Sequence, residues 1–229
     1  MTLPRQAGTF DELVRAARAL VVDGRRAVLG ITGSPGAGKT TLAAHLLAAL
    51  APAPPAGLPP HDWVAHLPMD GFHLADVELV RLGLRDRKGA PSTFDAYGYV
   101  NALRRLRADD EAVVYVPMFE RGLEQPVAGA VPVLTAARLV ITEGNYLLLD
   151  DEPWAGVRAL LDQVWFCAPD DDVRLERLVR RHIRFGKPPR MAHDWAHGTD
   201  ELNARLVSAG RALADVLVGP PVLEGLAPS

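Results

Sequence analysis

The sequence contains one cysteine, Cys167, and only three lysines, at positions 39, 88 and 187, among its 229 residues. A single cysteine forms no disulfide within the chain and cannot by itself make a thiolate metal site, so we expect Cys167 to be a core residue. GTPases select guanine through an N/T-K-x-D motif, and neither Lys88 nor Lys187 is part of such a sequence. These absences exclude a disulfide scaffold and a GTP-driven switch.

The sequence also has no apolar run long enough to cross a membrane, and its first residues lack the apolar region of a signal peptide. We therefore expect a cytoplasmic protein with no membrane partner. The formal net charge of -3 at pH 7 argues against binding nucleic acid through general attraction to phosphates. With 48% hydrophobic residues the chain can bury a full core, which predicts one domain over residues 1–229.

Short apolar runs alternate with helix-like segments along the chain. Thr9 to Glu12 forms a capping box that opens a helix within residues 1–25, and a proline-dense stretch at 51–61 predicts a surface loop. This alternation predicts an α/β fold, a three-layer sandwich around a mainly parallel five-stranded sheet. The expected strands are residues 27–32, 63–67, 113–116, 139–143 and 164–167, and helical patterns cover 96–107 and 171–185.

The strongest motif is the run 33–40, Gly-Ser-Pro-Gly-Ala-Gly-Lys-Thr, which matches the phosphate-binding pattern G-x-x-x-x-G-K-[ST] between a strand and a helix. Its glycines let backbone N–H groups converge on phosphates, and the following helix adds its positive end. Lys39 is expected to reach the β- and γ-phosphates, and Thr40 to bind Mg²⁺. The predicted ATP contacts are Gly33, Ser34, Gly36, Ala37, Gly38, Lys39, Thr40 and Thr41.

Two acids follow predicted strands, at the edge where parallel sheets bind ligands. Asp70 follows the strand 63–67, and we expect it to accept the proton of an attacking hydroxyl; a helix cap or turn carboxylate is the alternative. Glu143 ends the strand 139–143 as a Walker B acid does, and it is expected to hold Mg²⁺ directly or through water; a capping acid is the alternative. His73 is a candidate contact for the acceptor.

Four arginines share one face of the predicted helix 171–185, at positions 174, 177, 181 and 184. A solvated basic face is the ordinary explanation for such a stripe. Beside a triphosphate it also fits a lid, over residues 170–197, that supplies bidentate contacts and excludes water. The residues that we expect to close over the phosphates are Arg177, Arg181 and Arg184.

His193 and His197 stand four residues apart, superficially like the H-E-x-x-H helix of zinc proteases. The second position is Asp194 rather than Glu, no third ligand is evident, and Gly198 follows at once. We therefore do not expect a zinc site.

Several segments resemble the phosphate-loop kinases that include bacterial type I pantothenate kinase, uridine kinase and phosphoribulokinase. Residues 68–73 are similar to the T-D-G-F segment of pantothenate kinase, residues 87–95 to its R-K-G-x-P-x-S-Y-D tract, and residues 141–148 to the E-G stretch of the group. Residues 200–206 resemble an uncharacterised nucleoside/nucleotide kinase-like branch. The resemblance extends from about residue 27 to about residue 187 and implies a P-loop NTPase fold, nucleotide-kinase-like with a helical lid, and an Asp70 base.

The acceptor is less well defined, because residues 116–121 lack the histidine that the resembled kinases carry there. Arg121 beside Glu120 suggests a polar or anionic acceptor, and Tyr97 is a second candidate for its pocket. We predict an ATP- and Mg²⁺-dependent kinase that phosphorylates a hydroxyl of a small pantothenate-, nucleoside- or sugar-like metabolite. The alternative is an ATP-binding regulator or transport accessory without an acceptor. A homodimer is left open.

Overall fold

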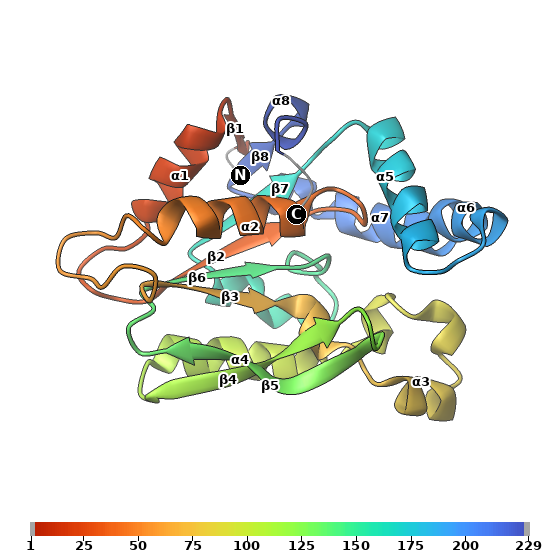
Figure 1. The fold of residues 1–229 in the computed structure, drawn as a ribbon, viewed down its shortest axis with the longest axis horizontal. Helices are drawn as coiled ribbons and strands as arrows, with labels where there is room; N and C mark the ends of the chain where they lie inside the picture. Colours follow the sequence, from red (N-terminus) through yellow and green to blue (C-terminus); the bar gives the residue numbers. More distant parts are fainter. Residues whose placement is uncertain (1–2, 227–229) are drawn as a thin grey trace.

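A computed structural model describes residues 3–226, and its centre is a sheet of six strands in the order β1-β8-β7-β2-β6-β3 (Figure 1). Every neighbouring pair in this sheet is parallel. A parallel sheet requires crossover connections, and helices supply most of them here. The strands are β1 (Arg5–Ala7), β2 (Ala27–Thr32), β3 (Val64–Pro68), β6 (Leu139–Glu143), β7 (Gln163–Cys167) and β8 (Val216–Val218).

The predicted α/β architecture is confirmed, but the expected five-stranded sheet is wrong in two respects. Residues 113–116 are not a strand of the parallel sheet; they begin β4 (Val113–Glu120), which pairs antiparallel with β5 (Gln125–Leu134) in a separate hairpin. This strand has only one face buried, whereas the strands of a parallel sheet are covered on both. The edge strand β1 and its neighbour β8 are three residues each and too short to produce a pattern.

Figure 1 shows the sheet between two further layers, and apolar side chains pack against both of its faces. On one face α1 (Phe10–Arg18) and α2 (Lys39–Leu50) pack through Leu13, Leu42 and Leu46, all fully buried. On the other face α4 (Ala96–Ala108) and the β4–β5 hairpin pack around Tyr99 and Leu103. Each such leucine contributes about 1.5–3 kcal/mol by leaving water. The sheet is thereby fixed as a platform whose strands end at one common edge.

Helix α1 begins where the capping box predicted. The Thr9 hydroxyl accepts a hydrogen bond from the Glu12 amide at 3.2 Å, and the Glu12 carboxylate accepts one from the Gly8 amide at 2.9 Å. Residues 51–61 form neither helix nor strand, as their prolines predicted. Two donors of the helix start are thus satisfied within the chain.

Four further helices gather at the carboxyl edge of the sheet: α3 (Asp76–Leu82), α5 (Asp171–Arg184), α6 (Pro189–His197) and α7 (Thr199–Ala209). In Figure 1, α5 and α6 lie on one side of this edge, and α3 with the end of the hairpin lies on the other. The site is built between these two groups. The remaining short helices are η1 (Met69–Phe72), η2 (Arg85–Arg87), η3 (Pro91–Thr93), η4 (Trp154–Gly156), η5 (Arg158–Leu160), η6 (Arg211–Leu213) and α8 (Pro220–Leu223).

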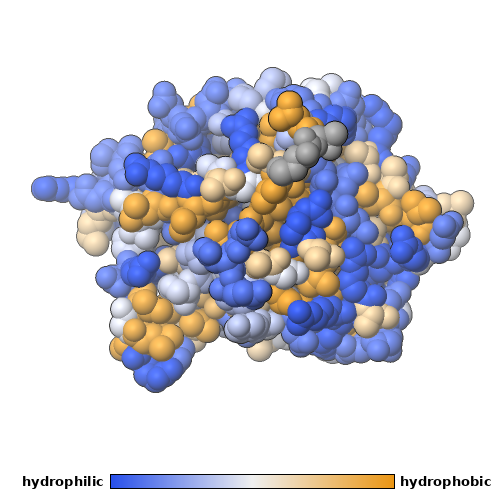
Figure 2. Space-filling model, turned by 180° about the vertical axis from the view of Figure 1, so that it is seen from behind, coloured by the Kyte–Doolittle hydropathy of each residue, from blue (hydrophilic) through white to orange (hydrophobic). Residues whose placement is uncertain are grey.

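Helix α3 carries exposed apolar side chains, with Val77 80% and Val80 60% exposed. Figure 2 shows apolar surface on the lobe that projects at the lower left, where α3 lies.

Across residues 3–226, no helix combines the length and the apolar character that crossing a bilayer requires.

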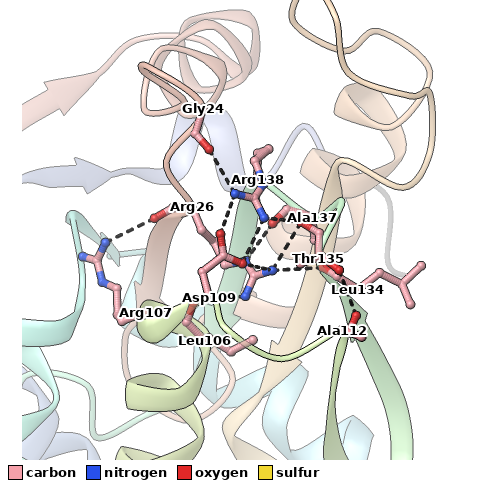
Figure 3. Close-up of polar contacts among 10 residues, drawn as sticks. All are labelled: Gly24, Arg26, Leu106, Arg107, Asp109, Ala112, Leu134, Thr135, Ala137 and Arg138. Carbon is pink, nitrogen blue, oxygen red and sulfur yellow. Dashed lines mark hydrogen bonds and ion pairs between the residues drawn. The ribbon is translucent and has the colours of Figure 1, made fainter.

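The opposite edge of the sheet holds a cluster of charge around Arg26 (Figure 3). Its guanidinium donates to the carbonyl oxygens of Ala137 at 2.8 Å and Leu106 at 3.0 Å and lies 2.7 Å from Asp109. Arg138 binds the same carboxylate at 2.6 Å. These contacts join the start of β2 to the end of α4 and to the segment before β6.

Candidate active site

Residues 33–38 connect β2 to α2 and form the phosphate loop. Gly38 adopts a φ of 87°, in the left-handed region where a glycine has no Cβ to clash, and α2 begins at the next residue. The free N–H groups of the first turn of α2 therefore point toward the carboxyl edge of the sheet. Lys39 is 8% exposed, and its ammonium donates to the carbonyl oxygens of Gly33 at 2.9 Å and Ser34 at 3.0 Å.

Helix α7 supports the phosphate loop from outside. The Ser34 hydroxyl lies 3.4 Å from the hydroxyl of Ser208 on α7, so this side chain faces the helix. Arg174 of α5 is only 3% exposed and bridges Glu201 of α7 at 2.8 Å to the carbonyl oxygen of Pro35 at 3.4 Å. Arg174 thus shares the predicted basic stripe but serves as a buried tie between α5, α7 and the loop.

Asp70 lies in η1, which turns the chain directly after β3. A Cβ at Gly71 would clash with the carbonyl group of Pro117, so the absent side chain lets η1 press against the hairpin. The hairpin register shifts between Val116 and Met118, as in a β-bulge. Arg121 at the end of the hairpin then lies 3.5 Å from the Asp70 carboxylate. Two segments about 50 residues apart are thereby brought to one point.

Glu143 ends β6, between β2 and β3, where the register pairs it with Ile31 on one side and Pro68 on the other. It is 4% exposed, and its carboxylate accepts a hydrogen bond from the Thr40 side chain. Burial first, and then the negative charge of Asp70, raise the pKa of Glu143 to about 7, against the lowering effect of Lys39. The two carboxylates and the lysine therefore act on one another at close range.

The pKa values of Asp70 and Lys39 also respond to this crowding. Burial would raise the pKa of Asp70, but positive charge from His73 when protonated and from Arg181, Arg121 and Lys39 lowers it overall. Burial lowers the pKa of Lys39, although Glu143 and Asp70 oppose this. Burial likewise lowers the pKa of His73, whose Nδ1 lies 2.8 Å from the Asp70 carbonyl oxygen. Strongly perturbed groups that share one cleft are typical of functional sites.

A cavity of about 370 Å³ opens between the phosphate loop, η1, the hairpin and α5 to α7. It brings together seven of the residues that the sequence analysis singled out: Lys39, Thr40, Asp70, His73, Arg121, Glu143 and Arg181. Sequence reasoning did not assign a role in this cavity to other residues of its wall, among them Asp76, Lys88, Phe119, Asn145, Phe185, Lys187, Trp195 and Asn203. All of these except Asp76 lie in segments that the sequence analysis named, but nothing local to the sequence shows that their side chains meet at one cavity.

Other predicted residues lie outside the cavity wall. Tyr97 is 70% exposed on α4, and Arg184 lies over the ring of Phe185, 5.9 Å from its centroid. Arg177 lies beside the loop, where its Nη1 would be 3.9 Å from a Cβ at Gly38. His193 and His197 stack on each other along α6, with ring centroids 4.1 Å apart.

His66 is a neighbour of the site that sequence reasoning missed. Its Nε2 is buried without a hydrogen-bond partner among the described residues and lies 3.9 Å from the Glu143 carboxylate. Burial lowers the pKa of His66 to about 4, so the ring is neutral near pH 7. Side chains alternate along β3, so His66 lies with Val64 on the face of the sheet that α2 covers. Only the pairing of β3 with β6 brings it close to Glu143.

Residues 28–185 match the sequence profile described as the phosphoribulokinase/uridine kinase family. The matched segment contains the phosphate loop, Asp70, Glu143 and α5, and it is more than half of the chain. The chain belongs to the phosphoribulokinase/uridine kinase family. The resemblance inferred from the motifs is therefore confirmed, and so is a P-loop kinase fold.

Individual members of the phosphoribulokinase/uridine kinase family and similar structures extend this comparison. The chain is 32% identical over 217 residues to a pantothenate kinase of Sorangium cellulosum, covering 90% of this chain and 67% of that protein. It is 35% identical over 196 residues to the uncharacterized protein YggC of Escherichia coli, covering 85% of this chain and 78% of that protein. A crystal structure described as a candidate fructose transport system kinase from Silicibacter sp. TM1040 superposes with a TM-score of 0.79 at 34% identity, covering 92% of this chain and 99% of that one.

Proposed function

We propose that this protein is an ATP-dependent kinase that transfers the γ-phosphoryl group to a hydroxyl of a small metabolite. The observation that carries the proposal is the convergence of Lys39, Asp70 and Glu143 on one cavity that extends beyond the phosphate loop. A nucleotide switch binds no acceptor beside the phosphate loop. A transferase needs room for an acceptor next to a carboxylate. Membership of a kinase family supports the same conclusion.

In this proposal the loop amides and Lys39 hold the β- and γ-phosphates and neutralise charge that develops during transfer. Asp70 accepts a hydrogen bond from the acceptor hydroxyl, aligns its oxygen with the γ-phosphorus and takes its proton. The pKa of Asp70 is lowered, so the carboxylate is ionised near pH 7 and is a weak base. A weak base suits phosphoryl transfer, whose loose transition state needs the proton to move only late.

Thr40 and Glu143 fit a magnesium ion, because both offer hard oxygen donors beside the phosphate loop and already contact each other. Bound there with ATP, the ion would neutralise negative charge on the phosphates. Glu143 must be ionised to serve it, and its pKa of about 7 makes this dependent on pH. Arg181, from the cavity wall, and Arg177, beside the loop, would close over the phosphates and exclude water.

The test is Asp70→Asn, which removes the base and keeps the size of the side chain. We expect acceptor-dependent ADP release to fall by about 10²- to 10⁴-fold, the usual contribution of a general base, while the affinity for ATP changes little. Asp110→Asn is the matched control, since Asp110 is exposed and outside the cavity wall. Normal turnover by Asp70→Asn would make this carboxylate a structural cap.

The alternative role is an ATP-binding regulator or transport accessory. It is distinguished from a kinase by whether ADP release by the wild-type protein depends on an added acceptor. Pantothenate and fructose, named for two similar proteins, and uridine, named for the family, are the first acceptors to offer. A kinase releases ADP in proportion to the acceptor supplied. ADP release that no acceptor stimulates, across a wide panel of alcohols, would favour the regulator.

A further inference from the structure

We infer that the acceptor is an anionic alcohol, a small molecule with a carboxylate or phosphate a few bonds from its reacting hydroxyl, and that Arg121 binds the anion. This inference rests on the proposed kinase function and specifies its substrate class. Three features of the cavity support it: the contacts of Arg121, the positions of cations without a close carboxylate, and the side chains that contact the aromatic rings.

The guanidinium of Arg121 lies over two aromatic rings and makes few polar contacts. Its carbon lies 5.9 Å from the ring centroid of Phe119 on the hairpin and 5.5 Å from that of Phe185 at the end of α5. Within the described part of the chain its only polar contact is with Asp70, at 3.5 Å, and the side chain is 35% exposed. An arginine has five N–H donors in a planar fork. Most of these donors remain available to a ligand in the cavity.

A second cation in the wall, Lys187, packs against an aromatic ring. It lies over Trp195, 4.8 Å from the ring centroid, and no carboxylate among residues 3–226 lies within ion-pairing distance of it. Lys88 and Arg85 differ, because both contact the Asp76 carboxylate, at 2.7 Å and 3.2 Å. Away from the phosphate loop, the cations of the wall without a close carboxylate of their own are therefore Lys187 and Arg121, whose contact with Asp70 is long, while Lys88 and Arg85 share one negative charge.

The aromatic rings of the wall are already occupied by side chains of the chain itself. Phe119 lies beneath Lys88, which is 5.3 Å from its ring centroid, as well as beneath Arg121, and Phe94 contacts His73 in a tilted arrangement with centroids 4.0 Å apart. Phe185 contacts Arg121 and Arg184, and Lys187 lies over Trp195, so a planar base would compete with these cations for the ring faces. The wall thus presents cationic groups to the acceptor, which favours an anion over a nucleobase.

Arg121 and Asp70 are close enough for one small acceptor to contact both. A hydroxyl bound to Asp70 would lie about 2.7 Å from the carboxylate, and an anionic oxygen about 2.8 Å from the guanidinium. Since the two side chains are 3.5 Å apart, one small molecule can satisfy both. Hydroxy acids and sugar phosphates share this chemistry.

The first experiment compares acceptors in matched pairs that differ only by the anionic group. Glycerate with glycerol tests a carboxylate, ribose 5-phosphate with ribose tests a phosphate, and uridine tests a base. We expect the anionic member of at least one pair to be used at least about tenfold better in kcat/KM, as for one charged hydrogen bond. Equal or better use of neutral members or uridine would overturn the inference and leave the kinase intact. No acceptor-dependent ADP release with any member would overturn both.

The second experiment assigns the recognition to Arg121. In Arg121→Gln the preference within pairs should fall to about twofold or less while KM for ATP stays within about twofold, and Arg121→Lys should restore part of the preference. Arg180→Gln is the control, because Arg180 is solvent-exposed on α5 and pairs with Glu176. Circular dichroism and a thermal melt check that each variant folds. A raised KM for ATP with the acceptor preference retained would show that Arg121 serves the nucleotide, and would overturn the assignment.

Discussion

Two clusters of buried charge lie at opposite edges of the parallel sheet. At the amino edge, Arg26 is 5% exposed and shares Asp109 with Arg138 (Figure 3). At the carboxyl edge, Lys39 is 8% and Glu143 is 4% exposed. Burial is similar in the two places, so their different behaviour has to come from how completely each charge is satisfied.

The guanidinium at the amino edge has an acceptor for every nitrogen. Arg26 donates from its Nε and Nη1 to two carbonyl oxygens and from its Nη2 to the Leu134 carbonyl oxygen at 3.1 Å, with Asp109 at 2.7 Å. At the carboxyl edge two carboxylates repel each other, the pKa of Glu143 rises to about 7, and His66 keeps a buried nitrogen with no hydrogen-bond partner in residues 3–226. A complete network rigidifies a fold, whereas an incomplete one leaves groups free for ligands.

The largest effect expected on stability comes from Arg26→Met. The change leaves several buried carbonyl oxygens without donors, and we expect the free energy of unfolding to fall by about 3–5 kcal/mol. Urea unfolding at pH 7 measures it. Below the melting temperature the variant should still bind ADP, because this cluster lies across the sheet from the phosphate loop. A loss under about 1 kcal/mol would mean that water replaces the missing donors, and the contrast between the edges would fail.

The same kind of substitution at the other edge, Lys39→Met, should act on activity instead. Removal of this phosphate-binding charge is expected to lower kcat/KM by about 10²- to 10³-fold, or about 3–4 kcal/mol of transition-state stabilisation. The free energy of unfolding should stay within about 1 kcal/mol of wild type, since methionine removes a buried charge along with its hydrogen bonds. Initial rates of ADP release and urea unfolding give the two numbers. A variant that loses stability and keeps its rate would assign Lys39 to the fold.

Glu143→Gln tests whether the buried carboxyl of Glu143, which lacks full compensation of its charge, makes the unfolding free energy depend on pH. The pKa of Glu143 is raised from 4.5 to about 7, so its protonated form contributes stability below pH 4.5, and this contribution is lost as pH rises through 7. The quantity to follow is the unfolding free energy of wild type minus that of the variant. Between pH 4.5 and pH 8 this difference should fall by at most about 3 kcal/mol.

Urea unfolding at pH 5, 6, 7 and 8, without nucleotide or magnesium, follows this difference. Shared groups far from position 143 cancel, so the slope reports the carboxyl at position 143 together with the groups whose pKa values respond to its charge, Asp70 and Lys39. A difference that stays constant across these pH values would show that the pKa of Glu143 is ordinary. The contrast between the two edges would then rest on geometry alone.

The sequence predicted those parts of the fold whose signal is local. Strands such as β2 and β6 are continuous apolar runs, and the observed bounds of β6, Leu139–Glu143, equal the expected ones. The hairpin was misplaced because Val113–Val116 looks like a short buried strand until its antiparallel partner is known. Pairing between distant segments leaves no periodicity of its own.

The site shows the same division between local and long-range signals. The phosphate loop and the acids Asp70 and Glu143 follow strands and could be located from the chain. Arg174 and Arg181 belong to one helical stripe. Arg174 is buried because it binds the distant residues Glu201 and Pro35, and so it connects α5 to α7 and to the phosphate loop. No pattern in residues 171–185 distinguishes the two arginines.

The smallest effect is expected at Tyr97, which the sequence analysis chose for the acceptor pocket and the structure leaves 70% exposed on α4. Its neighbours Ala96 and Tyr99 are buried, so the helix turns position 97 toward solvent and away from the cavity wall. In Tyr97→Ala the unfolding free energy should change by less than about 0.5 kcal/mol, as at most exposed sites, and KM for an active acceptor should stay within about twofold. Steady-state kinetics beside Arg121→Gln provide the comparison. A rise of tenfold or more in the acceptor KM would mean that α4 reaches the acceptor after closure, and the boundary of the site would have to be extended to include it.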